Sequence, residues 1–220
     1  VRDGEEFTLR FPVDAETPTH ISSINAVELW NDIVESATKT AEPGLLMWGN
    51  IEKYLPAEAY ADDGFKTICT NPCGEIPLSA YDSCRLISVN LKNFVKNPFT
   101  EKASFDYKHF SKVAAYAMRL SDDLVELEIE KLDSIIKACD TDDEKELWEN
   151  LKTACVNGRR TGLGTLEKCL SLACLSLAYD SEEGIEVIDK IYKTLKVSAY
   201  TESVNLAQER GAFAVFNWEK

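Results

Sequence analysis

The residue types most able to do chemistry are an amide, a thiol and a carboxylate at alternate positions: Asn71, Cys73 and Glu75. A second thiol, Cys84, follows eleven residues after the first. In an extended chain alternate side chains project to one face, so this spacing predicts a thiol held between an amide and a carboxylate. Gly74 permits a close approach that a Cβ would block. The segment is therefore a candidate reactive tip.

The residues alone leave three interpretations of this tip open. The first is a structural turn around a buried free cysteine, because free Cys often packs as a small hydrophobe. The second is a metal site formed by Cys69, Cys73 and Cys84. Against it, the chain has no Cys-x-x-Cys pair, and His20 and His109 lie far away in the sequence.

The third interpretation is thiol chemistry, with Cys73 as the reactive sulfur and Cys84 as an electron donor. Glu75 would then be a general base and Asn71 an orienting amide. A neighbouring carboxylate disfavours the thiolate form, so the pattern does not suit an ordinary thiolate nucleophile. One-electron sulfur chemistry needs no thiolate and fits the pattern better.

Composition limits the class of protein. The chain has 220 residues, 45% of them hydrophobic and 28% charged, which is enough for a packed core in one or two domains. A net charge of −14 argues against broad binding to nucleic acid or anionic membranes. We find no apolar run of about 18 residues and no secretory signal, so we expect neither membrane insertion nor secretion. Seven cysteines, an odd number, predict reduced thiols in the cytoplasm.

The elements that must position the tip alternate between short strands and helices, which predicts an α/β fold. We expect strands at 7–12, 65–70 and 84–91, and helices at 25–40, 45–54, 107–136, 141–158, 165–177 and 182–209. Residues 17–23 read as a polar connection and residues 77–83 as a turn-rich return. The tip is then a loop between two extended segments.

The finger loop and following strand of the ribonucleotide reductase catalytic subunit closely resemble three segments of this chain: NPCGEIPL (71–78), YDSCRL (81–86) and VNL (89–91). Other family motifs resemble, in the same order, LW (29–30), AEPG (41–44), RLSDD (119–123), RRTGLG (159–164) and ERGAF (209–213). The resemblance therefore spans nearly the whole chain. The tip is most similar to the adenosylcobalamin-dependent class II enzymes.

This resemblance implies a ten-stranded α/β barrel with a central finger loop and long flanking helices, of which residues 1–220 are the middle part. It implies that Cys73 becomes a thiyl radical and abstracts the ribose 3′ hydrogen, and that Glu75 takes the 3′-hydroxyl proton. Asn71 would hydrogen-bond the substrate hydroxyls. Cys84 would be one member of the dithiol that reduces the ribonucleotide to a deoxyribonucleotide. We expect its partner thiol, the substrate-phosphate loop and the C-terminal cysteines to lie outside this chain.

The resemblance also implies cofactors and partners. The expected cofactor is adenosylcobalamin, although none of its contact residues can be named; no metal ligand is expected. The alternatives are a class I subunit, whose radical comes from a separate iron or manganese protein, and a non-catalytic module that pairs with another chain. Implied partners are a ribonucleotide substrate, dNTP or ATP effectors of the full-length protein, a thioredoxin-like or dithiol reductant, and a second copy in a homodimer.

Other polar and sulfur-containing residues have structural interpretations. We expect the remaining five cysteines to be packing residues: Cys69, Cys139, Cys155, Cys169 and Cys174. Arg159 and Arg160 could hold a phosphate or a cobalamin tail. A helix-terminal pair that binds the carboxylates of this acidic chain is the favoured interpretation.

Overall fold

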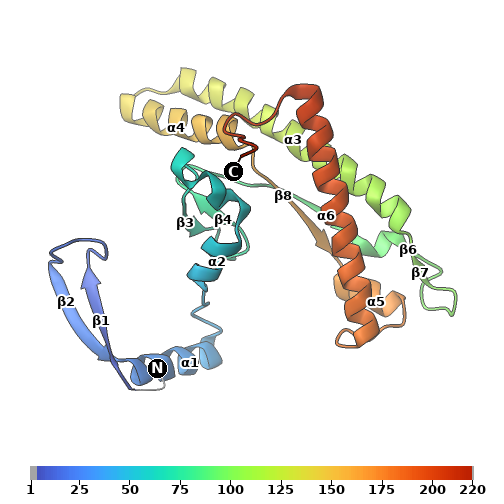
Figure 1. Ribbon diagram of the computed structural model, residues 1–220, viewed down its shortest axis with the longest axis horizontal. Coiled ribbons are helices and arrows are strands. Elements are labelled where there is room, and N and C mark those ends of the chain that lie inside the picture. Colours follow the sequence, from blue (N-terminus) through green and yellow to red (C-terminus); the bar gives the residue numbers. More distant parts are fainter. Residues whose placement is uncertain (1–3, 220) are drawn as a thin grey trace. The chain divides into compact units, whose positions relative to one another are not determined.

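The computed structural model describes residues 4–219, which form two compact units (Figure 1). The first unit ends at Ile51 and the second begins at Glu52, inside helix α2 (Trp48–Tyr54). Within the described range, no helix is long and apolar enough to cross a membrane. All of the candidate site residues belong to the second unit.

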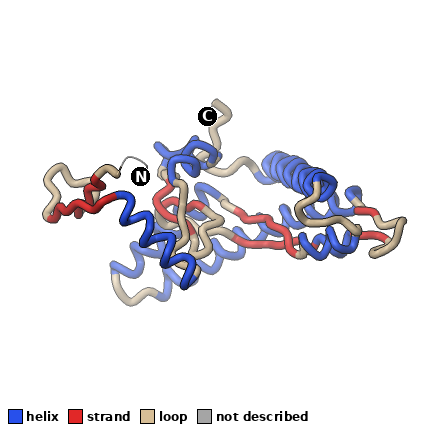
Figure 2. Tube along the Cα trace, turned by 90° about the horizontal axis from the view of Figure 1, so that it is seen from below, coloured by secondary structure: helices blue, strands red, loops and turns tan. Residues whose placement is uncertain are grey.

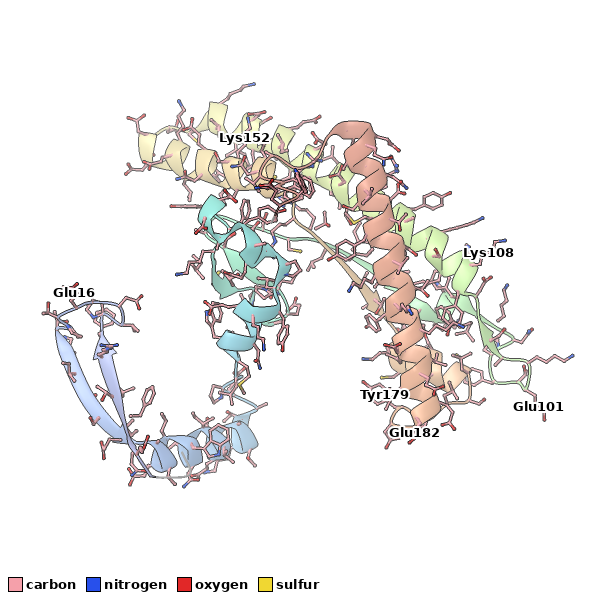
Figure 3. All side chains as sticks on the ribbon, in the orientation of Figure 1. Glu16, Glu101, Lys108, Lys152, Tyr179 and Glu182 are labelled. Atoms are coloured by element: carbon pink, nitrogen blue, oxygen red, sulfur yellow. The ribbon has the colours of Figure 1, made fainter. Side chains whose placement is uncertain are left out.

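The first unit is a β-hairpin followed by a helix. Strand β1 (Glu6–Phe11) pairs antiparallel with β2 (His20–Asn25), and Glu16 lies at the tip of the hairpin (Figure 3). Helix α1 (Ala26–Thr40) begins where the Asn25 side chain accepts a hydrogen bond from the Val27 amide at 2.9 Å. Strand β2 contradicts the polar connection expected at 17–23. The serines of this segment do not favour a strand locally, but pairing with β1 stabilises the extended conformation.

Three long helices dominate the second unit: α3 (Tyr107–Ala138), α4 (Asp142–Gly158) and α6 (Glu182–Arg210). They confirm the helices expected at 107–136, 141–158 and 182–209. Helices α3 and α4 form a hairpin, in which Lys152 Nζ (Figure 3) lies 2.6 Å from Asp133 Oδ1. Helix α6 packs along α3. At the start of α4, Thr141 Oγ1 accepts a hydrogen bond from the Glu144 amide, which is the expected cap.

The main core lies between α3, α6 and the turn η2 (Leu91–Phe94) that follows β5 (Arg85–Asn90). Leu91, Phe110 and Ile191 are completely buried there. Burial of each such side chain contributes about 1.5–3 kcal/mol to stability. This core fixes β5 against α3, and therefore fixes the residue that precedes β5, Cys84.

The remaining elements are short. They are η1 (Pro56–Asp63), β3 (Thr67–Thr70), β4 (Pro77–Ser79), β6 (Val95–Lys96), β7 (Ser104–Phe105), β8 (Thr161–Leu166) and α5 (Lys168–Cys174). Strand β8 contradicts the helix expected to begin at residue 165: the chain stays extended to Leu166 because it pairs with β5. The helix α5 begins only at Lys168.

In residues 4–219 the strands form four separate two-stranded sheets, shown in red in Figure 2. The pair β5 and β8 is parallel, with Arg85 opposite Thr161, and its crossover connection contains α3 and α4. The pairs β1–β2, β3–β4 and β6–β7 are antiparallel. The α/β class is confirmed, and the described part of the chain contains no closed barrel.

Candidate functional site

The candidate tip is a loop between two extended segments, but the second of them is β4 and not the strand expected at 84–91. Strand β4 contradicts the turn-rich return expected at 77–83, because its pairing with β3 stabilises an extended conformation there. Thr70 pairs with Pro77 across the hairpin, and the amide of Asn71 donates to the Ile76 carbonyl at 3.1 Å. The Asn71 side chain closes the loop a second time, because its Oδ1 accepts from the Ile76 amide at 2.9 Å. Gly74, with φ of 79°, takes a left-handed conformation that side chains disfavour.

The loop is a turn, so the extended alternation expected for Asn71, Cys73 and Glu75 is wrong in detail. Instead, Asn71 Nδ2 donates a hydrogen bond to Glu75 Oε1, which brings the amide and the carboxylate together directly. The Cys73 thiol and the Glu75 side chain are exposed. Exposure of Cys73 contradicts the interpretation of a structural turn around a buried cysteine.

The second thiol lies in a space that a glycine provides. Cys84 is half-buried immediately before β5, and Gly162 of β8 lies opposite Leu86. A Cβ at Gly162 would lie 2.5 Å from Cys84 Sγ and 2.7 Å from Leu86 Cδ2. Gly162 was not among the functional residues expected from the sequence. The signal that could have found it is a glycine inside a strand, which often marks a close approach.

Charged groups surround the Cys84 thiol. Burial raises its pKa above the ordinary thiol value, and the positive charges of Arg160 and Arg85 oppose this rise. The carboxylates of Asp82 and Glu75 raise the pKa further. The raised pKa leaves a larger protonated fraction of the Cys84 thiol at a given pH.

This raised pKa predicts slow alkylation of Cys84. At a given pH a higher pKa leaves a smaller thiolate fraction, so reaction with iodoacetamide should begin at higher pH in the folded protein than in urea. Peptide mapping by mass spectrometry between pH 7 and 10 measures the pH midpoint of Cys84 alkylation. In urea this midpoint should lie at about pH 8.5. A folded midpoint equal to or below the urea midpoint would contradict the prediction.

Arg85 is a buried cation next to this thiol that was not expected from the sequence. Its side chain is 6% exposed, and Nε forms an ion pair with Glu128 Oε2 at 2.5 Å. Nη2 lies 2.8 Å from Cys155 Sγ, and Nη1 donates to the carbonyls of Ser83 and Arg160. One guanidinium therefore joins β5 to α3, α4 and the segment before β8.

Removing the carboxylate partner of Arg85 should destabilise the protein. Glu128→Ala leaves a buried positive charge without its counterion, so we expect a loss of about 2 to 3 kcal/mol in the free energy of unfolding. Glu128→Gln keeps an acceptor and should lose less. Urea unfolding of the full-length protein measures both, with Glu130→Ala, an exposed glutamate of the same helix, as the control. Equal stability of the Ala variants at 128 and 130 would contradict the prediction.

The two arginines before β8 bind carboxylates, as expected. Arg159 donates from Nε and Nη2 to Asp122 Oδ1 at 3.0 and 2.7 Å. Arg210 of α6 donates to the other oxygen of Asp122 at 2.6 Å. Arg160 lies 2.7 Å from Asp82 Oδ2. The ion-pair interpretation of Arg159 and Arg160 is therefore confirmed.

The other cysteines differ from one another in burial. Cys155 and Cys174 are buried packing residues, and Cys139 is partly buried. Cys69 and Cys169 are exposed, so the expectation that they pack in the core is wrong. Local sequence does not tell which face of a short strand or helix meets the core. Among residues 4–219, no three His, Cys, Asp or Glu side chains lie close enough together to hold a metal ion.

The sequence matches a known protein family over nearly its whole length. The family model described as ribonucleotide reductase, barrel domain, matches residues 3–220. This chain belongs to the ribonucleotide reductase barrel-domain family. The family resemblance of the finger loop and its flanking motifs is thereby confirmed across the chain.

Individual relatives agree with this assignment. This barrel-domain chain is 30% identical to a vitamin B12-dependent ribonucleoside-diphosphate reductase of Thermoplasma acidophilum, over 94% of its own length and 24% of the relative. It is 29% identical to the protein of the same name from Mycobacterium tuberculosis strain H37Rv, over 93% of its length and 25% of the relative. The chain thus spans about a quarter of these relatives.

A solved structure supports the fold. The Actinobacillus ureae class Id ribonucleotide reductase alpha subunit superposes with a TM-score of 0.62 and 22% sequence identity. The match covers 86% of this chain and 33% of that subunit. This likeness in fold agrees with the barrel-domain family assignment.

Proposed function

We propose that the full-length protein carrying this segment reduces ribonucleotides to deoxyribonucleotides through a thiyl radical on Cys73. One observation carries the proposal: a single turn exposes both the Cys73 thiol and the carboxylate of Glu75, which Asn71 holds by a hydrogen bond. A radical reductase needs both a sulfur that substrate can reach and a nearby base.

The residues divide the chemistry between them. The Cys73 radical takes the 3′ hydrogen atom of the ribose, and Glu75 accepts the proton of the 3′-hydroxyl group. Asn71 orients Glu75 and hydrogen-bonds the substrate hydroxyls. Cys84 and a second thiol elsewhere in the full-length protein supply two electrons and two protons. They become a disulfide as the 2′-hydroxyl group leaves as water.

Adenosylcobalamin is the proposed radical source. The relatives named vitamin B12-dependent favour it over a separate di-metal subunit. The exposed Cys73 sulfur, with Gly74 next to it, fits a bulky group that must reach the sulfur from outside the chain. When bound, adenosylcobalamin supplies the initiating radical.

We further propose that residues 1–220 form the middle of a ten-stranded barrel in the full-length protein. The parallel pair β5–β8 supports this, because in the described residues each strand has one unpaired edge to which a further strand could add. The proposed substrate is a ribonucleoside diphosphate, as in the names of the relatives. We also propose that the full-length protein binds dNTP or ATP effectors, is reduced by a thioredoxin-like or dithiol reductant, forms a homodimer and is located in the cytoplasm.

Turnover by the full-length protein tests this function. Ribonucleoside diphosphate and a dithiol are supplied with and without adenosylcobalamin, and deoxyribonucleotide is measured by chromatography. We expect product only when adenosylcobalamin is present. Product that requires an added di-metal subunit instead would support the class I alternative. No product under either condition, from folded protein, would support a non-catalytic module.

A further inference from the structure

We infer that Arg160 and Asp82 are positioning residues for the proposed reduction, because they hold the loop that carries Glu75 against the segment that carries Cys84 and leads into β5. The inference rests on the proposed function for its effect on turnover. Neither residue touches the reacting sulfurs in the contacts described above. Their effect is exerted through the backbone segments that they join.

The Arg160 guanidinium spans the two segments. Its Nη2 donates to the Pro77 carbonyl at 2.8 Å, and its Nη1 donates to Asp82 Oδ2 at 2.7 Å. Pro77 is two residues after Glu75, and Asp82 is two residues before Cys84. Glu75 and Cys84 are therefore each two residues from a residue that the planar, rigid guanidinium of Arg160 binds.

Asp82 is built into this position. Its side chain is 1% exposed, and a carboxylate so buried requires a full set of partners. Besides Arg160, it accepts hydrogen bonds from the Ser83 amide at 2.9 Å and the Ser79 hydroxyl at 3.2 Å. Ser79 is the last residue of β4. Asp82 therefore fixes the return of the hairpin to the start of β5.

Arg160 is itself anchored to the parallel strands. Its carbonyl accepts a hydrogen bond from Arg85 Nη1 at 3.1 Å. The next residue, Thr161, pairs with Arg85 in the register of β5 and β8. A displacement of the hairpin relative to these strands would break the charge-assisted bonds of Arg160, which are stronger than neutral hydrogen bonds. The finger loop is thereby fixed relative to Cys84.

Variants of Arg160 in the full-length protein separate geometry from charge. Arg160→Ala removes both bonds and should lower kcat about 10- to 100-fold with little change in KM, since small misplacements of reacting groups have effects of this size. It should also move the midpoint of Cys84 alkylation to higher pH, because a positive charge near the thiol is lost. Asp82→Asn should lower kcat and move the midpoint to lower pH.

Arg160→Lys keeps the charge but cannot bridge Pro77 and Asp82 with a planar fork. For Arg160→Lys we expect a Cys84 alkylation midpoint near that of the unmodified protein. Its kcat should be reduced, as in Arg160→Ala. It also serves as the second variant if the alanine variant does not fold. Arg119→Ala is the matched control, because Arg119 also pairs with two carboxylates, Glu202 and Glu209, but joins α3 to α6.

Amide hydrogen exchange of the loop, read at Gly74 and Ile76, is a measurement that needs no turnover. We expect faster exchange in Arg160→Ala and no change in Arg119→Ala. Unchanged loop exchange and an unchanged alkylation midpoint in Arg160→Ala would overturn the inference even if the unmodified protein made no deoxyribonucleotide. An equal loss of kcat in Arg119→Ala would overturn it too, because the effect would then be general destabilisation. Failure of the proposed function alone appears as absent turnover with the loop effects retained.

Discussion

Replacing Cys73 with alanine should reduce deoxyribonucleotide formation by the full-length protein to the background of the assay. In the proposed reaction the sulfur of Cys73 is the atom that takes hydrogen from the ribose, and alanine has no atom that can hold the radical. The exposed position of Cys73 on its turn means that the substitution removes little packing. Circular dichroism and urea unfolding should therefore be unchanged, while turnover is lost.

The matched control for this variant is Cys69→Ala. Cys69 is an exposed cysteine of the same hairpin, and its Sγ lies 3.9 Å from the Leu78 carbonyl, which is a long contact. We expect its turnover to stay within about twofold, as for surface substitutions in general. If Cys73→Ala retained turnover, or if Cys69→Ala lost as much, the radical role of Cys73 would be wrong.

A methyl group at Gly162 should have the second large effect. The new Cβ would lie 2.5 Å from Cys84 Sγ and 2.7 Å from Leu86 Cδ2, closer than atoms can pack. Overpacking of this kind lowers the free energy of unfolding by about 1–3 kcal/mol. Since Cys84 must move to make room, we also expect turnover to fall about 10- to 100-fold.

Gly164→Ala, on the same strand, is the control for Gly162→Ala. A Cβ at Gly164 would lie 3.7 Å from Ser88 Oγ, which is an ordinary contact. Replacing glycine where the backbone permits it stabilises a protein by about 0.4–1 kcal/mol, so this variant should be as stable as the original or slightly more stable. The free energy of unfolding in urea and the turnover rate are compared between Gly162→Ala and Gly164→Ala. Equal effects at both positions would show that Cys84 does not depend on the space at Gly162.

Much of the local structure could be predicted because it depends on neighbours in sequence. Helix α4 begins where Thr141 caps it, and α1 begins at the Asn25 cap, through bonds that span three residues or fewer. The apolar spacing of α3 and α6 is equally local. The contiguous motif around Cys73 carried the family resemblance for the same reason.

Pairings between distant segments could not be predicted in this way. The serines of β2 do not by themselves favour a strand, and residues 165–166 belong to a segment with helical spacing. Both are extended because a partner strand supplies hydrogen bonds, and that partner is β5 for the second segment. The exposure of Cys69 likewise depends on which face of β3 meets the core.

For the site, the sequence by itself determined which groups are available: a thiol, a carboxylate and an amide within five residues, and a second thiol at Cys84. Only the tertiary structure decided how they are held. The turn that joins Asn71 to Glu75, the space at Gly162 and the bonds of Arg160 to Pro77 and Asp82 are its contributions. The space at Gly162 and the bonds of Arg160 link residues 78 to 83 positions apart in the sequence. Such contacts form only when packing of α3 and α4 returns the chain from β5 to β8.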